Sequence, residues 1–492
     1  QTKISSSDHA QHIWQRDGVI MANPPSHEHG SLLDDENSFT KVGESYVSRD
    51  ITHAPFALEP YPFPSSVFSK AQEMAPLFNK LVDKIARDES WLIENLEETA
   101  KNDVFTGKLM HILKQTQING LKQNCYFGIH RSDYMLHTLV PNNGESEESN
   151  IHEGFLQVEL NTIASSFGAL SSKLTEMYQS VYPSSRFHVP DNEALEKIVF
   201  GMQVAHHEYV NQTGCWDANV LFLVQADERN FADQRLLQHL LQQKYKIRVQ
   251  RATFQEIREE GVFGDEMSGF EFKFRHNEIS MIYFRSGYSP SDYKCDEDWD
   301  TRLKMELSRS IKCPNIAYHL AGTKKIQQVL CQPGQLERFL EAEDSSFIRG
   351  CFAGMYSLAA DNKERKNVVE KAIKKPELFV LKPQREGGGN NLYGNDVAIA
   401  LTKLTNEDLS AYVLMDKINS PTSRNVLIKK GKALSASCIC EIGIYGIYVS
   451  YGELGNDILN QSAGYLLRVK QDSSDEGGVA AGFSCLSSVS LI

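Results

Sequence analysis

Apolar residues recur at helical spacing soon after residue 50. Leu77, Leu81 and Ile85 each stand one helical turn apart, and similar spacing continues from residue 65 to about residue 116. Apolar positions three to four residues apart lie on one face of a helix. This segment is therefore predicted to form amphipathic helices that cover a core.

Short runs rich in β-branched and aromatic residues then alternate with further helical stretches. The predicted strands cover residues 156–160, 220–224, 279–284, 379–381, 412–415 and 441–451, with a predicted helix at 234–243. Such alternation is typical of mixed α/β proteins. Charged residues gather just past several strand ends, which is where open α/β sheets bind ligands.

Two stretches lack either pattern. Residues 1–50 are polar and are predicted to form an irregular extension, and residues 470–482 are polar and then glycine-rich, which predicts a mobile loop. The start at Gln1 is compatible with a trimmed form and with a mature form that has lost a signal peptide. The corresponding locations are cytoplasmic or secreted.

Composition narrows the choice of partners. The 492 residues carry a formal net charge of −13, which does not favour a nucleic acid backbone as partner, and their length suggests roughly two to four domains. No apolar run reaches the roughly 18 residues that span a membrane. The nine cysteines are odd in number and lack CxxC pairs, which predicts reduced thiols, as in a cytoplasmic enzyme.

The stretch from Lys382 to Asn391 is the strongest candidate for chemistry. Its three glycines, Gly387 to Gly389, free the backbone N–H groups to approach an anion, although such a run can also be a flexible connection. Arg385 adds a cation and Glu386 a carboxylate, as a Mg²⁺–nucleotide site needs. Because the P-loop pattern is missing, another nucleotide-binding scaffold is favoured.

Other polar residues fit the same chemistry. Glu159 and Asn161 alternate onto one face of a predicted strand, where they would either share a cation or face solvent. Candidate cations for carboxylates or phosphates are Arg131, Arg285, Lys324, Arg468 and Lys470. The chain has no HExxH, Gly-x-Ser-x-Gly or GxGxxG motif, so binding of polyphosphate, metal and carboxylates remains the best interpretation.

With these residues in view, the chain resembles the eukaryotic glutathione synthetases of the ATP-grasp superfamily. The matching runs are Arg131 to Met135, Val158 to Ile163, Glu228 to Asn230, Asp233 to Arg235, Lys312 to Pro314, Leu320 to Lys325, Lys382 to Gly394 and Glu476 to Gly482. The resemblance covers nearly everything from about Ala54 to Gly482. It implies an α/β fold with an ATP-grasp core of mixed sheets.

The resemblance also implies a domain organisation. The core would comprise residues 51–196 and 318–492, with a lid at roughly 370–440. A parallel α/β substrate domain would be inserted at 197–317, after the 1–50 extension.

The resemblance assigns roles to individual residues. Mg²⁺ would be held by Glu159, Asn161 and Glu386. ATP would be contacted by Lys324, Lys382, Gly387, Gly388, Gly389, Asn391, Tyr393, Met415, Lys417, Ile418, Glu441, Lys470 and Glu476. The substrate γ-glutamylcysteine and the acceptor would be contacted by Arg131, Ser165, Ser166, Glu228, Asn230, Gln234, Arg285, Tyr288, Arg468, Val479 and Ala480. The residues implied in catalysis are Arg468, Arg285 and Lys382.

The implied reaction is ATP-dependent ligation of γ-glutamylcysteine to glycine through an acyl phosphate, by a homodimeric enzyme. Ala480 and Ala481 favour glycine, because bulkier residues there accompany β-alanine in the family. Four positions depart from the family pattern, namely Ala164, Ser286, Glu476 and His130, and the chain has an insertion around residues 24–48. The alternatives are a ligase for another acceptor amino acid and a secreted or regulatory binding protein with reduced turnover.

Overall fold

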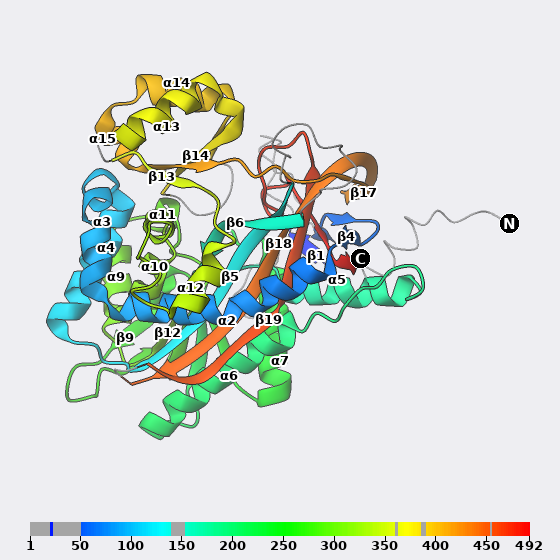
Figure 1. Cartoon of the computed structure of the whole chain (residues 1–492). Coiled ribbons are helices and arrows are strands. Elements are labelled where there is room, and N and C mark those ends of the chain that lie inside the picture. Colours follow the sequence, from blue (N-terminus) through cyan, green and yellow to red (C-terminus); the bar gives the residue numbers. More distant parts are fainter. Residues whose placement is uncertain (1–19, 23–50, 139–152, 360–362, 385–389, 453–454) are drawn as a thin grey trace, which may run out of the picture.

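The computed structural model describes residues 20–22, 51–138, 153–359, 363–384, 390–452 and 455–492. Its architecture is mixed α/β, as predicted, with three multistranded sheets and helices on their faces (Figure 1). The described residues include no helix that is long and apolar enough to cross a membrane.

A seven-stranded, largely antiparallel sheet forms the centre of the molecule. Its order is β17-β3-β20-β19-β18-β5-β6. The strands are β3 (Phe56–Ala57), β5 (Cys125–Thr138), β6 (Glu153–Asn161), β17 (Ser423–Lys429), β18 (Lys432–Tyr451), β19 (Asn456–Gln471) and β20 (Cys485–Ser487). β18 is the longest and pairs antiparallel with both β19 and β5.

Apolar clusters cover both faces of this sheet. Because successive side chains of a strand point to opposite faces, one strand contributes to both clusters. Ile444 of β18 belongs to the apolar cluster that includes α2 residues, whereas Ile447 belongs to a second cluster that includes α6 (Ala194–Thr213) residues. This explains why β18 is apolar almost throughout from Ile442 onward instead of alternating with polar residues.

The predicted N-terminal helices are confirmed as α2 (Ser65–Arg87), α3 (Glu89–Asn102) and α4 (Val104–Asn119). An aspartate stands immediately before α3 and another immediately before α4. The Asp88 side chain accepts a hydrogen bond from the Trp91 amide at 3.2 Å, and Asp103 accepts one from the Thr106 amide at 2.8 Å. Both act as N-caps that satisfy otherwise unpaired backbone donors.

A second sheet lies within the residues predicted to form the substrate domain and is parallel at its centre. β7 (Asn219–Leu223) pairs in parallel with β8 (Val249–Ala252) and β11 (Asn277–Phe284), and β11 pairs in parallel with β12 (Ile311–Cys313). β9 (Gly261–Phe263) and β10 (Phe272–Phe274) extend it antiparallel. The associated helices are α5 (Gly168–Val181), α7 (Phe231–Tyr245), α8 (Phe254–Glu260) and α9 (Asp296–Glu306), with the 3-10 turn η1 (Pro290–Asp292).

The third sheet is smaller and has its own apolar cluster. Its order is β13-β16-β14-β15, formed by β13 (Met355–Ser357), β14 (Phe379–Pro383), β15 (Leu392–Tyr393) and β16 (Tyr412–Asp416). It carries α13 (Lys363–Lys374), α14 (Asn395–Lys403), α15 (Asn406–Ser410) and the turn η2 (Pro376–Leu378), which form the yellow and orange unit at the top of Figure 1. Leu381 and Leu414 lie fully buried in its cluster.

The remaining elements connect these sheets. They are α10 (Ile316–Ala321), α11 (Lys324–Leu330), α12 (Ala342–Arg349) and the strand pair β4 (Tyr61–Phe63) with β21 (Val489–Leu491).

Two expectations from the sequence need correction. Within the polar extension, β1 (Ile20–Ala22) pairs antiparallel with β2 (Ile51–His53), because strand pairing needs only a short β-prone run and a partner. Second, β19 continues to Gln471, where Ile439 and Lys470 are cross-strand partners, so the predicted loop begins later than residue 470.

Candidate active site

A cavity of about 180 Å³ lies between the small sheet and the central sheet. Its walls combine apolar side chains such as Val380, Met415 and Ile439 with charged ones such as Lys324 and Glu441. Apolar walls with a few placed polar groups are typical of sites for small ligands.

Every predicted ATP-contacting residue that the structure describes lines this cavity. They are Lys324, Lys382, Asn391, Tyr393, Met415, Lys417, Ile418, Glu441, Lys470 and Glu476. The remaining predicted ATP ligands, Gly387, Gly388 and Gly389, lie outside the described residues, as does the predicted metal ligand Glu386.

The lysines of the cavity are held by the strands and helices around it. Lys382 on β14 donates to the Val158 carbonyl of β6 at 2.8 Å. Lys324, at the start of α11, lies 3.7 Å from the Glu159 carboxylate. Lys470 donates to the Asp475 carbonyl at 2.6 Å, and burial lowers the pKa of Lys470. These cations can bind the negatively charged oxygens of a polyphosphate.

Glu159 is ionised at neutral pH. Burial alone would raise its pKa, but the charges of Lys324 and Lys382, with smaller contributions from Arg468 and Arg131, lower the pKa to about 2. The Asn161 amide lies beside it, with Nδ2 3.3 Å from Glu159 Oε1. A carboxylate and an amide oxygen suit Mg²⁺, which takes few protein ligands and shares phosphate oxygens.

This donor set is small. Among the described residues, no group of three or more His, Cys, Asp and Glu side chains could hold a metal ion. The predicted set of Glu159, Asn161 and Glu386 contains only two carboxylates, one of them outside the described part of the chain. It fits a metal that a nucleotide helps to bind better than a fully protein-bound ion.

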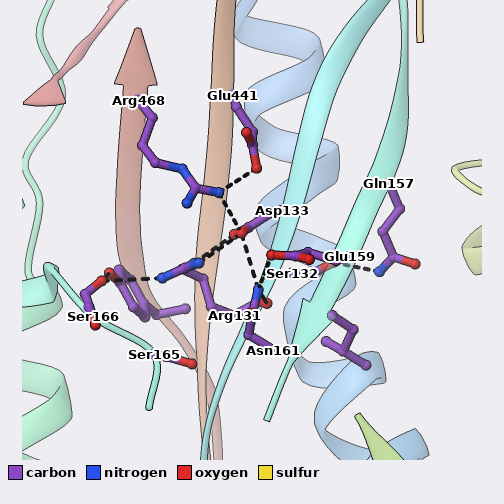
Figure 2. A network of polar contacts seen from close by, with 12 residues as sticks. Arg131, Ser132, Asp133, Gln157, Glu159, Asn161, Ser165, Ser166, Glu441 and Arg468 are labelled. Carbon is purple, nitrogen blue, oxygen red and sulfur yellow. Dashed lines mark hydrogen bonds and ion pairs between the residues drawn. The ribbon is translucent and has the colours of Figure 1, made fainter. Parts of the chain in front are cut away.

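A buried ionic network joins the cavity to the neighbouring strands (Figure 2). Arg468 on β19 donates to Glu441 of β18 and, at 2.8 Å, to Asp133 of β5. Asp133 also accepts from Arg131 Nε at 2.6 Å. Burial lowers the pKa of Arg468, but the charges of Glu441 and Asp133 outweigh it and leave that pKa raised.

Predicted substrate residues gather next to this network. Arg131 Nη1 donates to the Ser166 carbonyl at 3.3 Å, and Arg285, which follows β11, donates to the Ser166 hydroxyl. Arg285 is only 4% exposed, and two of its guanidinium nitrogens, Nε and Nη1, have no hydrogen-bond partner among the described residues. Buried cationic donors without an acceptor suit a ligand carboxylate.

The loop after β7 supplies another group of predicted residues. Glu228 accepts from the Asn230 amide at 2.8 Å and from the Gln234 side chain at 2.6 Å. Tyr288 accepts from Gln225 at 3.0 Å. The loops after β7 and β11 therefore bring these residues to the carboxyl ends of parallel strands, where α/β sheets bind ligands.

The remaining predicted residues are less central. Ser165 is buried and its hydroxyl donates to the Ile129 carbonyl at 3.2 Å. Val479 is buried in an apolar cluster, Ala480 is exposed, and the cavity lining on this loop ends at Gly478. Among the departures from the family pattern, Ala164 adopts a positive φ of 52°, and Glu476 lines the cavity.

Several charged residues of the site have no predicted role, among them Asp133, Asp233 and Arg251, and the cavity-lining Asp416, Asp472 and Asp475. Asp133 lies in the ionic network, and Asp233 accepts from the Phe167 and Ala169 amides at 2.8 and 3.0 Å. Arg251 on β8 donates to Gln234 at 2.7 Å, and burial lowers its pKa to about 10. Asp133 and Asp233 stand inside the matched runs of the sequence, which was the available signal. Arg251 stands in none of them.

Comparisons with known proteins show the class of this chain, an ATP-dependent carboxylate–amine ligase. A family model described as "Eukaryotic glutathione synthase, ATP binding domain" matches residues 20–491. The chain is 41% identical over 475 residues to the chloroplastic glutathione synthetase of Solanum lycopersicum, covering 94% of this chain and 82% of that protein. It is 38% identical over 451 residues to the glutathione synthetase of Dictyostelium discoideum, covering 89% and 91%.

The chain therefore belongs to the eukaryotic glutathione synthases, and its activity is that of a glutathione synthetase. A solved structure supports the fold. The apo form of a glutathione synthetase-like effector from Globodera pallida superposes with a TM-score of 0.74 over 99% of this chain and 97% of that one, at 18% identity. At that identity the likeness concerns the fold alone.

Proposed function

We propose that the protein uses ATP and Mg²⁺ to join γ-glutamylcysteine to glycine through an acyl phosphate. The observation that carries this proposal is that the site has two neighbouring parts, one suited to a nucleotide and the other to carboxylates. A lysine-lined cavity of nucleotide type borders the Arg131–Asp133–Arg468 network. Through Ser166 that network borders Arg285, two of whose guanidinium nitrogens have no partner in the described part of the chain.

The proposed roles follow from charge and position. Lys324, Lys382 and Lys470 would hold the polyphosphate, and the apolar walls of the cavity would take the base. Arg131 and Arg285 would bind carboxylates of γ-glutamylcysteine. Arg468, which belongs to the network and also lines the cavity, would stabilise charge that develops on the reacting carboxylate. Catalysis would then depend on positioning and electrostatics, without a protein nucleophile.

Glu159 and Asn161 would hold Mg²⁺, together with Glu386. Bound there, the metal would neutralise charge on the phosphate oxygens. The low pKa of Glu159 keeps its carboxylate ready for a cation at neutral pH.

Phosphate release tests the proposal. With ATP and Mg²⁺ present, we expect release only when γ-glutamylcysteine and glycine are both supplied. A rate that is highest with β-alanine or serine would refute glycine as acceptor and retain the ligase. Release without any acceptor would contradict the proposed coupling.

The variant Glu159→Gln tests the metal assignment. It keeps the shape of the side chain and removes the charge, so we expect kcat to fall by roughly 10–100-fold and the Mg²⁺ requirement to rise. Glu278→Gln is a matched control, because Glu278 is also a partly buried carboxylate, paired with Arg309 at 2.5 Å, and does not line the cavity. Equal losses in both variants would argue against a metal role for Glu159.

We further propose a homodimer in the cytoplasm. All nine cysteines are free thiols in the structure, which suits a reducing compartment. Sedimentation equilibrium measures the assembly, and a monomer at micromolar concentration would contradict the dimer.

A further inference from the structure

Asp133 is the carboxylate on which the two halves of the site meet. It lies on β5 opposite Gly443 of β18, and it is fully buried. A Cβ atom on Gly443 would lie 2.4 Å from Asp133 Oδ1 and 2.7 Å from Arg131 Cδ. The neighbouring strand therefore needs glycine at this position to leave room for the Asp133–Arg131 pair.

The carboxylate of Asp133 makes four hydrogen bonds. Oδ1 accepts from Arg131 Nε at 2.6 Å, and Oδ2 accepts from Arg131 Nη2 at 2.8 Å. Oδ2 also accepts from Arg468 Nη2 at 2.8 Å and from Asn161 Nδ2 at 3.1 Å. Figure 2 shows the three partners converging on this side chain from β5, β19 and β6.

The two-point contact fixes the plane of the Arg131 guanidinium. Its Nε and Nη2 are bound by Asp133, so Nη1 is the nitrogen directed at Ser166 in the substrate cluster. Two buried guanidiniums, those of Arg131 and Arg468, also share this one carboxylate. Without its charge they would repel each other in a region of low dielectric.

Asp133 also orients the Asn161 amide. Three oxygens surround the amide nitrogen, namely the Arg131 carbonyl at 3.4 Å, Asp133 Oδ2 at 3.1 Å and Glu159 Oε1 at 3.3 Å. All three oxygens are hydrogen-bond acceptors, and the amide nitrogen is the only donor of the Asn161 side chain. The nitrogen, and not the amide oxygen, therefore occupies the position between them. The amide oxygen is therefore turned away from Asp133 and is available to a cation.

We propose that Asp133 is a positioning residue that holds Arg131, Arg468 and Asn161 in one arrangement and touches no reactant itself. The inference rests on the roles proposed above for those three partners. It predicts that removing the Asp133 charge weakens γ-glutamylcysteine binding, slows turnover and raises the Mg²⁺ requirement together.

A purely structural carboxylate provides the comparison. Asp83 on α2 is 2% exposed and accepts from Arg87 Nε at 2.8 Å, Tyr318 at 2.6 Å and Ser450 at 3.0 Å. It matches Asp133 in burial and in pairing with an arginine. None of its partners lies in the site.

The experiment compares full-length wild type, Asp133→Asn and Asp83→Asn. We expect Asp133→Asn to raise the KM for γ-glutamylcysteine, lower kcat and raise the half-saturating Mg²⁺ concentration, each by roughly 10–100-fold. Calorimetric titration with γ-glutamylcysteine alone should show the same loss of affinity. Asp83→Asn should lower the Tm and leave these values within about twofold, per folded molecule.

A second pair of variants decides the matter if Asp133→Asn does not fold. Gly443→Ala displaces the Asp133–Arg131 pair and keeps every charge, so it should weaken γ-glutamylcysteine binding in the same titration. Gly446→Ala is its control on the same strand, because that Cβ would meet Asn79 Oδ1 at 2.2 Å, away from the site.

The outcomes separate the two proposals. A wild-type protein that does not bind γ-glutamylcysteine would overturn the proposed function and this inference with it. A wild type that binds, with Asp133→Asn within twofold of it or indistinguishable from Asp83→Asn, would overturn only the role of Asp133. Equal affinities in Gly443→Ala and Gly446→Ala would overturn that role when Asp133→Asn is unfolded.

Discussion

At the scale of the residue, His130 shows what complete burial does to an ionisable side chain. It is 1% exposed, and its ring lies 5.3 Å from that of Tyr318, centroid to centroid. Neither ring nitrogen has a hydrogen-bond partner among the described residues. Burial therefore lowers the pKa of His130 to about 3, and the residue is neutral in the folded protein at neutral pH.

This shift makes stability depend on pH. Below the ordinary histidine pKa of about 6.5 the unfolded chain takes up a proton that the folded protein does not. The contribution of neutral His130 is thus complete above pH 6.5 and is lost as the pH falls toward 3. At pH 5 the loss amounts to about 2 kcal/mol.

Between pH 7 and pH 5, we expect the free energy of unfolding of His130→Asn to fall by about 2 kcal/mol less than that of the wild type. Urea unfolding at each pH measures it. His111→Asn is the control, because His111 is exposed on α4. An unchanged slope in His130→Asn would contradict a buried neutral His130.

At the scale of the element, α6 depends on a close approach to the central sheet. A Cβ atom on Gly201 would lie 2.3 Å from Ile447 Cγ2 of β18 and 3.2 Å from the Phe127 ring. Glycine within a helix ordinarily costs about 1 kcal/mol relative to alanine. The contact with β18 explains why glycine stands here in spite of that cost.

Gly201→Ala should therefore destabilise the protein by roughly 1–3 kcal/mol, because overpacking outweighs the better helix propensity. Unfolding in urea measures the change. Adding Ile447→Ala removes the atom that the new methyl meets most closely, so the two changes should be strongly non-additive in a double-mutant cycle. Simple additivity would show that the helix moves aside instead.

At the scale of the whole molecule, the small sheet with α13, α14 and α15 stands apart from the two larger apolar clusters. Among the described residues, its own cluster contains ten buried side chains, including Leu358, Phe379 and Leu409. A unit with a small core and a cavity along one side is expected to open more readily than the central sheet. This agrees with the lid that we propose for roughly residues 370–440.

Amide hydrogen exchange tests this proposal. We expect faster exchange in α13 and α14 than in β18 and β19, and slower exchange in the small sheet after Mg-ATP is added, because the nucleotide would bridge the two sheets. Exchange rates that are equal in both regions, or unaffected by nucleotide, would contradict an independently opening lid.

Much of this organisation was accessible from the sequence. The helical spacing of residues 65–116 and the strand runs that became β6, β7, β11, β14 and β16 correctly predicted element type. β18 was predicted only from residue 441, because its first residues, such as Lys432 and Ser435, are exposed and polar. The short strand β1 was missed because a three-residue pair leaves no period to detect.

The site divides in the same way. Lysines and carboxylates beside strand ends could be proposed as ligand groups from their chemistry, and ten of the proposed ATP contacts do line one cavity. The sharing of Asp133 between Arg131 and Arg468 could not be foreseen, because it depends on the register that sets β5 beside β18 and β18 beside β19. Long-range register carries no local sequence signal.

The pairing of β18 with β19 has a consequence for how this protein can change over evolutionary time. Arg468 and Lys470 stand on one strand, two positions apart and held by β18, so the cations that we propose for the carboxylate and for the phosphates are fixed by the same strand pairing. The exposed segment around Ala480 to Gly482 is attached to that strand but is not part of the sheet. With the acceptor contact that the family resemblance implies for Ala480, gene copies could diverge in that segment and use other amines while the proposed activation of the carboxylate stays unchanged.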